Sequence, residues 1–276
     1  MSKRDGQTDT AERTPTESSR HDERAVVPQT DVLGRIVYDY HRDRLRGDPA
    51  RLHADGRVTA ADPSRHFRGY DGWSAVEHAA LDRVRGRILD LGCGAGRHAR
   101  WLQRRGESVL AVDDSPDAVR TARERGVENC AVMRLADLAV SEARFDAVSL
   151  LGTRFGGCDY PVGMRSTLAD LYAVTTTEGR VILDVEDPRE VERAEPIDRW
   201  NGDDSRRGVY GWPDEGPASY ARRWYRVSYG DWLGRWTRLA MLTPAQCRAV
   251  VAGTRWRVGD LVRHCDDPRY AVVLKK

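Results

Sequence analysis

The sequence predicts a layered α/β fold in which a mostly parallel sheet is covered by helices on both faces. Two near-continuous apolar segments, 88–91 and 145–151, have the pattern of strands that are buried on both sides. Segments of helical periodicity alternate with such strands along the chain, which is the order of βαβ units. A glycine-rich turn at 92–96 joins the first of these strands to a helix. In such a fold the ligand is expected at the carboxyl ends of the strands.

The composition bounds the size and the partners of the protein. The chain has 276 residues, enough for one large domain or two small ones, and a formal net charge of +2. Such a small charge creates no global field that would attract nucleic acid or a membrane surface. Arginine supplies nearly all of the 45 basic residues, since the only lysines are Lys3, Lys275 and Lys276. This favours recognition of phosphate or carboxylate groups, or it reflects coding bias alone.

Cysteine spacing and the absence of long apolar runs indicate the compartment. The five cysteines lie far apart without a C-x-x-C pair, so neither a disulfide framework nor a structural metal site is expected. The N-terminus lacks the apolar core of a secretory signal, and no apolar run approaches the roughly 18 residues of a membrane span. We expect a soluble, cytoplasmic protein with reduced thiols, no metal and no membrane partner.

The chain before residue 87 divides into a tail and a helical extension. Residues 1–30 are polar and poor in large apolar side chains, so we expect them to be disordered. Residues 31–86 are expected to form an N-terminal helical cap, in which Asp31 caps a first helix, 47–71 are irregular, and a second amphipathic helix follows. The apolar positions of the two helices are Leu33, Ile36, Val37, Tyr40, Val76, Ala80, Leu81 and Val84.

The segment from Arg87 to Asp114 has the clearest pattern in the chain. It contains an apolar strand, a glycine turn, a helix that ends near Gly106, and a second apolar strand at 108–112 that leads to Asp113. Glycines allow backbone of positive φ and a close approach of a ligand. The free N–H groups of the helix that follows point at that ligand. A carboxylate at the tip of the second strand can accept hydrogen bonds from a ribose diol.

The spacing within the turn decides between cofactors. The dinucleotide pattern G-x-G-x-x-G would need glycine at position 97, where this chain has Arg97. The sequence that is present, Asp90-Leu-Gly-Cys-Gly-Ala-Gly96 followed by Asp113, resembles motif I and the second-strand acid of class I S-adenosylmethionine-dependent methyltransferases. The resemblance implies a Rossmann-like seven-stranded sheet with helices on both faces, an N-terminal helical extension and an inserted β-hairpin. It also implies S-adenosyl-L-methionine as the cofactor.

The resemblance further implies which residues bind the cofactor. The glycine turn would hold the amino-acid part, and Asp113 the ribose hydroxyls. Asp114 stands where the family usually has an apolar residue against the adenine, so a polar contact is expected there. An acid after the third strand would accept from the adenine amino group. The expected cofactor-binding residues are Asp90, Gly92, Cys93, Gly94, Gly96, Asp113, Asp114, Asp137, Leu138 and Leu151.

Three residues are expected at the rim of the site as substrate contacts. Arg154 lies in the Gly152–Gly157 loop, which follows the fourth strand and should face the transferable methyl group. Glu186 ends the fifth strand, 180–185, which is expected after a turn at 175–179. Tyr70 precedes the motif, together with Trp73, although aromatic packing beneath a helix explains both equally well. No catalytic base is identified.

Residues 191–242 are expected to form an aromatic-rich insertion. The segments 219–229 and 232–242 alternate around Gly230-Asp231, which predicts a β-hairpin. One face of its first strand carries Tyr220, Arg222, Trp224 and Arg226. A substrate pocket, a subunit interface in a homodimer, plain packing and stacking on single-stranded nucleic acid all remain open. Residues 243–276 are expected to add a helix capped by Thr243-Pro244 and two edge strands, 256–262 and 270–274.

The predicted function is transfer of a methyl group to a nucleophilic nitrogen or oxygen of a small molecule by in-line displacement. The core, 87–190, would bind the cofactor. The loop after the fourth strand lacks both the Asn/Asp-Pro-Pro-Tyr motif and the Pro-Cys motif of DNA methyltransferases, so nucleic acid is not the expected partner. An RNA-directed methyltransferase and a non-catalytic S-adenosylmethionine-binding protein remain as alternatives.

Overall fold

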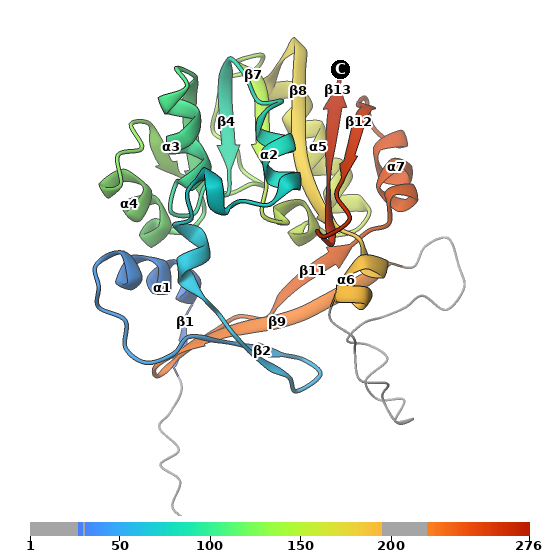
Figure 1. Ribbon diagram of the computed structural model, residues 1–276. Coiled ribbons are helices and arrows are strands. Elements are labelled where there is room, and N and C mark those ends of the chain that lie inside the picture. The colour runs from blue at the N-terminus through green and yellow to red at the C-terminus, as the bar shows by residue number, and fades with distance from the viewer. Residues whose placement is uncertain (1–26, 30, 195–219) are drawn as a thin grey trace, which may run out of the picture.

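The computed structural model describes residues 27–29, 31–194 and 220–276. Within these residues the chain forms a seven-stranded central sheet flanked by helices and a six-stranded second sheet, here called the cap sheet. The cap sheet crosses below the edge of the central sheet toward which β4 points, and this is the carboxyl edge of the parallel strands (Figure 1).

The central sheet has the order β12-β13-β8-β7-β4-β5-β6. Neighbouring strands from β6 to β8 pair in parallel, whereas β13 runs antiparallel to both β8 and β12. Its strands are β4 (Arg87–Leu91), β5 (Ser108–Asp113), β6 (Cys130–Val132), β7 (Phe145–Leu150), β8 (Thr175–Glu186), β12 (Arg257–Arg263) and β13 (Arg269–Lys275). The predicted seven-stranded α/β fold is confirmed.

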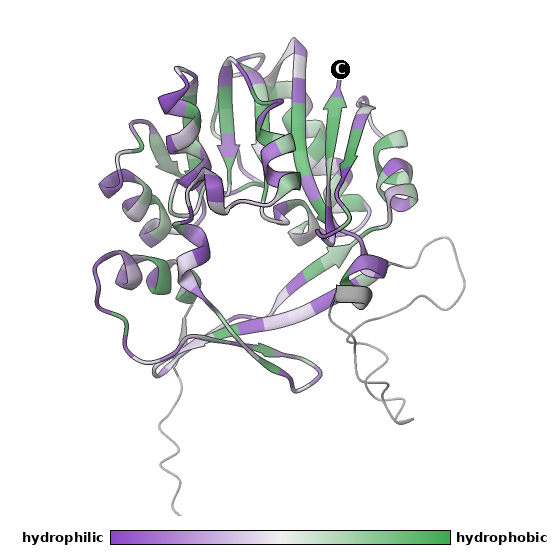
Figure 2. Ribbon diagram, in the orientation of Figure 1, coloured by the Kyte–Doolittle hydropathy of each residue, from purple (hydrophilic) through white to green (hydrophobic). Residues whose placement is uncertain are grey.

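Helices cover both faces of the central sheet. Alternate residues of one strand enter opposite hydrophobic clusters: Ile88 packs with Leu81 and Leu102, while Leu89 packs with Leu168 and Val250. The strands are accordingly apolar along their length (Figure 2). The α-helices are α1 (Val32–His41), α2 (Ala75–Leu81), α3 (Arg97–Arg104), α4 (Pro116–Glu124), α5 (Val162–Val174), α6 (Pro188–Ala194) and α7 (Pro244–Ala252).

The cap sheet combines strands from distant parts of the chain. It has the order β1-β10-β9-β2-β3, and β11 pairs with the other part of β9. Its strands are β1 (Val27–Gln29), β2 (Ala50–His53), β3 (Val58–Ala60), β9 (Ala221–Tyr229), β10 (Trp232–Gly234) and β11 (Thr237–Met241). The predicted hairpin is confirmed, since β10 and β11 both run antiparallel to β9. Figure 2 shows that β9 is far less apolar than the central strands.

Helix α1 joins the cap sheet to the central fold. As predicted, Asp31 caps this helix by accepting from the N–H of Gly34 at 3.1 Å. Its other oxygen accepts from the hydroxyl of Ser115 at 2.8 Å, directly before α4. At the far end, buried Asp39 accepts from the hydroxyl of Tyr229 in β9 at 3.2 Å. The helix therefore sets the spacing between α4 and the cap sheet.

Three predictions about local structure are wrong. Residues 47–71 are not irregular, because they contain β2, β3 and two short 3-10 helices, η1 (Pro63–His66) and η2 (Tyr70–Gly72), so 31–86 is not a purely helical cap. The expected turn at 175–179 is strand, because the β-branched residues Thr175–Thr177 extend β8 directly from the end of α5. Val27–Gln29 pair with β10 although they belong to the predicted disordered tail; the rest of that tail lies outside the described residues.

Candidate functional site

The glycine turn closes against the neighbouring strand. Gly92, Gly94 and Gly96 all have positive φ, at 75°, 53° and 74°. The N–H groups of Gly92 and Cys93 both donate to the carbonyl of Val112 on β5, at 2.8 and 3.0 Å. The three glycines therefore let the chain reverse between β4 and α3 at the carboxyl edge of the sheet.

Asp113 ends β5 beside this turn. One of its carboxylate oxygens accepts from the N–H of Gly94 at 2.9 Å, and the other accepts from the N–H of Ser115 at 3.0 Å. The residue is 3% exposed. These bonds hold the carboxylate at the tip of the strand and within reach of a ligand on the turn.

Asp90 lies under the same turn. It is 2% exposed, and its Oδ2 atom has no hydrogen-bond partner among the described residues. Burial raises the pKa of this carboxyl, and the charge of His98 opposes that rise. An unpartnered carboxylate oxygen is costly in a protein interior, so Asp90 is suited to receive a donor from a ligand.

Arg154, at the start of η3 (Arg154–Gly157), extends over the turn. A Cβ atom built on Gly92 would lie 2.7 Å from Nε of Arg154, so the side chain rests directly on this glycine. Its Nη2 atom lies 3.4 Å from the carboxylate of Asp113. The guanidinium thus covers the place where a ligand of the turn would lie, and it pairs with the acid expected to bind that ligand.

His66, in η1, covers the other side of the turn, and the sequence analysis did not identify it. Its Nδ1 atom would lie 3.7 Å from a Cβ atom on Gly94. Burial, followed by the charges of Arg154 and Arg65, lowers the pKa of His66 to about 3. The imidazole is therefore neutral at neutral pH, and it can exchange hydrogen bonds with a ligand but is a weak base.

A network of buried charges supports the turn from the side of α2. Glu77 contacts Arg97 and His98 of α3 and lies 3.5 Å from Arg269 of β13. Burial alone would raise the pKa of Glu77, but His98, Arg97 and Arg269 outweigh it and hold the pKa well below its ordinary value. The network fixes the first turn of α3, which follows the glycine turn.

The inner face of the cap sheet closes the site from below. Along β9, Ala221, Val227 and Tyr229 are buried, which marks the odd-numbered residues as the inner row. In this row Arg223 lies 3.5 Å from Glu186 at the end of β8. On β2, Arg51 and His53 pair with Val227 and Tyr225 and share their face.

Two residues of the row singled out from the sequence, Trp224 and Arg226, lie on the opposite face, whereas Tyr220, directly before β9, packs against the core cluster of the central sheet. Trp224 and Arg226 engage Arg238 and Trp236 in cation–π contacts at 5.7 and 4.8 Å. Even-numbered residues of β9 are therefore directed away from the inner row. The aromatic residues of the insertion correctly predicted a hairpin. They drew attention to the outer face of its first strand, however, and not to the inner face that borders the site.

Comparison with known proteins agrees with this geometry. Residues 88–179 match the family model described as a methyltransferase domain. The chain contains a class I S-adenosylmethionine-dependent methyltransferase domain. The predicted family is confirmed for this part of the chain, which spans β4 to the first residues of β8.

Three similar proteins illustrate the extent of the likeness. A ubiquinone biosynthesis O-methyltransferase of Xanthomonas oryzae is 37% identical over 26% of this chain and 33% of its own length. A trans-aconitate 2-methyltransferase of Mycobacterium tuberculosis is 43% identical over 20% of this chain and 22% of its own length. The chain thus spans a third or less of these relatives.

The third similar protein is a methyltransferase from Bacteroides fragilis, whose crystal structure was determined in complex with S-adenosyl-L-homocysteine. It has 21% sequence identity and a TM-score of 0.71, with 89% of this chain and 94% of that chain covered. The shared fold therefore extends beyond the methyltransferase domain itself.

On the expected adenine side of the methyltransferase domain, the predicted residues differ in their surroundings. Asp114 directly follows Asp113, and desolvation and the charge of Asp113 raise its pKa. Asp137 is exposed, and Leu138 packs at the edge of a core cluster. Leu151 is 4% exposed at the end of β7. Their cofactor contacts stay predictions.

Tyr70 and Trp73 pack against the helices. The ring of Tyr70 stacks with His78 and Trp101, at centroid distances of 4.1 and 5.2 Å. Trp73 meets His98 edge-on at 4.9 Å. These contacts match the packing alternative for both residues, whereas Arg154 and Glu186 do lie at the carboxyl edge.

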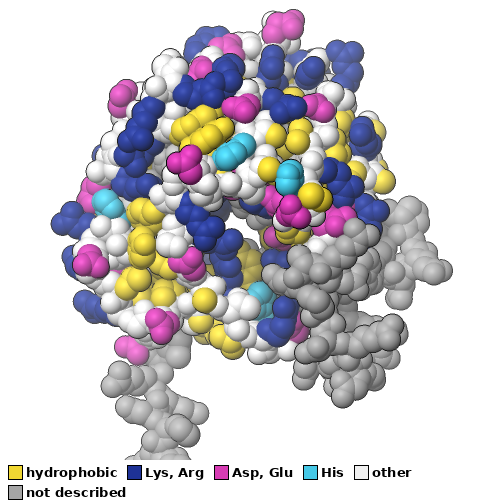
Figure 3. All heavy atoms as spheres, in the orientation of Figure 1, with side chains coloured by type: hydrophobic (Ala, Val, Ile, Leu, Met, Phe, Trp, Pro, Cys, Tyr) yellow, Lys and Arg dark blue, Asp and Glu magenta, His cyan; other side chains and the backbone are white. Residues whose placement is uncertain are grey.

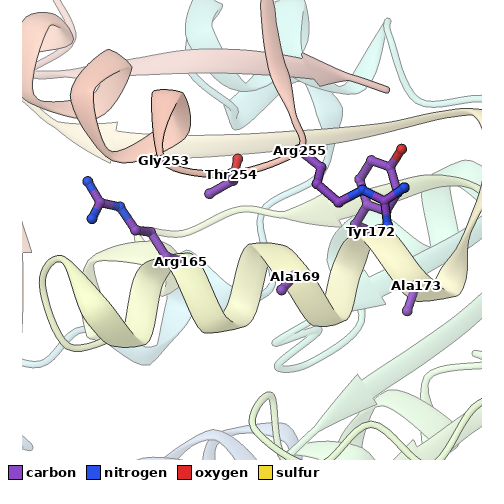
Figure 4. Close-up of a pocket in the computed structure, with 7 residues that line it drawn as sticks. All are labelled: Arg165, Ala169, Tyr172, Ala173, Gly253, Thr254 and Arg255. Carbon is purple, nitrogen blue, oxygen red and sulfur yellow. The ribbon is translucent and has the colours of Figure 1, made fainter.

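Two further features lie outside the site. A hollow of about 340 Å³ between α5 and the segment after α7 is lined by Tyr172, Arg255 and their neighbours (Figure 4). His264, Cys265 and Asp266 form an exposed group after β12 whose side chains could meet on a metal ion, although the cysteine spacing predicted no metal site. All five cysteines are free. None of the described helices is both long and apolar enough to cross a membrane.

Proposed function

We propose that this protein is an S-adenosylmethionine-dependent methyltransferase that transfers a methyl group to a nitrogen or oxygen of a small molecule. The observation that carries the proposal is the pairing of the glycine turn with Asp113, whose carboxylate is held at the carboxyl edge by Gly94 and Ser115. The match of the surrounding segment to the methyltransferase domain supports the same cofactor.

The donor set suits S-adenosylmethionine. Asp113 would accept from the ribose hydroxyls, and the unpartnered Oδ2 atom of Asp90 offers an acceptor for the amino-acid part. The guanidinium of Arg154 would have to leave Gly92 when the cofactor binds, because it rests on the turn and contacts Asp113. Cofactor binding would thereby free Arg154 for a second ligand.

Positioning is the main contribution proposed for the protein. The cofactor, when bound, supplies an activated methyl group with a neutral leaving group, and alignment of an acceptor with it can lower the barrier by several kcal/mol. His66 would hold the acceptor by a hydrogen bond rather than take its proton, since its pKa of about 3 makes it a poor base. Glu186 and Arg154 would contact the acceptor from the strand ends.

A small acceptor fits the charge and the relatives better than a nucleic acid. The two curated relatives are named for ubiquinone biosynthesis and for trans-aconitate, and both names refer to small molecules. The net charge of +2 gives no broad attraction to a polyanion. An RNA acceptor, a non-catalytic binding role and a homodimer remain as alternatives to be tested.

Calorimetric titration with S-adenosylmethionine, S-adenosylhomocysteine and NAD tests the proposal. We expect the first two to bind and NAD not to bind. Asp113→Ala should weaken binding by about 2 kcal/mol, roughly 30-fold, because hydrogen bonds to a charged acceptor are lost. Asp170→Ala, on the exposed side of α5, serves as the control. Unchanged affinity in a folded Asp113→Ala variant would remove the assignment of the ribose contact.

Turnover separates the remaining alternatives. The full chain would be incubated with methyl-labelled S-adenosylmethionine and either a pool of small molecules or a pool of RNA. Label in a small-molecule product supports the proposal, and label in RNA selects the RNA alternative. Cofactor binding without any transfer across both pools would favour a non-catalytic role.

A further inference from the structure

Arginine side chains converge on the space between the glycine turn and the cap sheet. Arg51 and Arg223 belong to its inner face, Arg65 lies in η1, and Arg154 reaches over the turn. Arg51, Arg65 and Arg154 all lie close enough to His66 for their charges to lower its pKa, after the effect of burial. Figure 3 shows a hollow between the central fold and the cap sheet, and Lys and Arg side chains lie at its border.

These positive charges exceed the carboxylates that face them. Arg223 pairs with Glu186, and Arg154 pairs with Asp113. Within the described part of the chain, neither Arg51 nor Arg65 has a carboxylate within 4.0 Å. Asp113 is the acid expected to bind the ribose, so the bound cofactor would take it from Arg154 and leave only the weaker influence of Asp114 on this guanidinium.

Part of the excess charge is also poorly solvated, since the Arg223 side chain keeps only 16% of its surface accessible. Arg65 is more exposed, and desolvation, followed by repulsion from Arg51 and other arginines, lowers its pKa. Burial likewise lowers the pKa of His53 on β2, with Arg51 and Arg223 among the charges that contribute. Like charges gathered in a partly desolvated space are destabilising unless an anion joins them. A ligand that brings negative charge would relieve this repulsion.

We infer that the methyl acceptor is a small anion whose carboxylate or phosphate group is held by Arg51, Arg65 and Arg223, with Arg154 joining them once the cofactor has taken Asp113. The planar guanidinium suits both groups, because its N–H donors match two oxygens at once. Tyr225 shares the inner face and supports Arg51, whose guanidinium lies 5.7 Å from its ring centroid. The inference rests on the proposed function and specifies its substrate class.

Anion binding to the cofactor-loaded protein tests the inference. The full chain would be saturated with S-adenosylhomocysteine and titrated with citrate and, separately, with pyrophosphate, and glycerol would serve as the uncharged probe. We expect at least one of the anions to bind and glycerol not to bind. The two anions distinguish a carboxylate from a phosphate preference. Arg51→Gln and Arg223→Gln should each weaken anion binding about tenfold, as loss of one charge-assisted contact predicts.

Arg226→Gln is the matched control, because this residue lies on the same strand but on the outer face, against Trp236. Thermal melting checks the fold of each variant, and Arg51→Gln keeps the test valid if Arg223→Gln loses its pair with Glu186 and unfolds. The inference is overturned if neither anion binds, or if the inner and outer variants weaken binding equally. If S-adenosylhomocysteine itself does not bind, the proposed function fails, and the same variants are then compared on the unloaded protein.

Discussion

Arg154 shows how one side chain can link two ligands. Its guanidinium rests on Gly92 and pairs with Asp113, so it competes with any nucleoside that needs the turn and the acid. The Arg154 side chain keeps 38% of its surface accessible. A partner that exposed can be exchanged at low energetic cost.

Arg154→Ala should therefore tighten the binding of S-adenosylmethionine. The lost pair is worth about 0.5–1 kcal/mol at this degree of exposure, which corresponds to roughly a threefold lower Kd. Calorimetric titration measures the Kd, with Arg180→Ala, exposed near the middle of β8, as the control. Weaker binding in Arg154→Ala would instead mean that the arginine contacts the cofactor.

Glu77 makes a prediction about pH. Its pKa is held below the ordinary value in the folded state, so its ion pairs stabilise the fold above the unfolded pKa of about 4.5 and lose this effect as the pH falls toward the folded pKa. Glu77→Gln should cost about 3–5 kcal/mol at pH 7, because it removes the carboxylate that Arg97 pairs with, whereas Arg269 keeps its pairs with Asp184 and Asp267.

The difference from the wild type should shrink when urea unfolding is repeated below pH 4.5, since the wild-type stabilisation is then being lost. Glu178→Gln, at an exposed position of β8, is the control and should change little at either pH. A difference that stays constant with pH would contradict the role of the Glu77 charge.

At the scale of elements, the glycine turn is constrained in two different ways. Gly94 and Gly96 both have positive φ, but their surroundings differ. A Cβ atom on Gly96 would lie 2.5 Å from Val127 and 3.1 Å from Ala122, whereas one on Gly94 would come no closer than 3.7 Å to His66. Gly96 therefore lets α3 pack closely on α4, and Gly94 leaves space on the side of the ligand.

Gly96→Ala should lower the free energy of unfolding by about 2–4 kcal/mol, from backbone strain together with overpacking. Gly94→Ala carries the strain alone and should lower it by about 1–2 kcal/mol. Urea unfolding of the two variants measures both effects. Equal losses would show that the contact with Val127 does not limit the packing of α3.

At the scale of the whole molecule, the site depends on how the cap sheet meets the carboxyl edge. Gly156 in η3 marks one such contact, because a Cβ atom there would lie 2.5 Å from the carbonyl oxygen of Ala240 and 2.8 Å from Leu239. This backbone-to-backbone approach holds β11 against the loop that carries Arg154. The space between the glycine turn and the cap sheet therefore depends on position 156, where no side chain larger than that of glycine fits.

Gly156→Ala should push the cap sheet away from η3. We expect the free energy of unfolding to fall by about 1–3 kcal/mol and amide hydrogen exchange to become faster in β9 and β11. Exchange in β4 and β5 should change little. Gly157→Ala is the control, since its Cβ atom would meet nothing within 4 Å. Equal exchange in both variants would show that this contact does not hold the cap sheet.

Local patterns in the sequence sufficed for the central sheet and for the methyltransferase domain. Strands such as 88–91 and 145–150 are apolar along their length because both faces are buried, and that signal needs no knowledge of the partner strand. The turn at 92–96 and the acid at 113 could be recognised for the same reason, because their spacing follows from one βαβ unit.

Only the tertiary structure decided how the site is closed. Arg51 faces Val227 because β2 pairs with β9 across about 175 residues of sequence, and nothing local to either strand specifies this partner. The alternation in β9 revealed two faces but not which one turns inward, so Arg223 was passed over in favour of the row with Trp224. His66 was missed for a related reason, since η1 reaches Gly94 only through the fold. Hydrophobic periodicity records whether a face is buried, whereas the partner of that face depends on the packing of the whole chain.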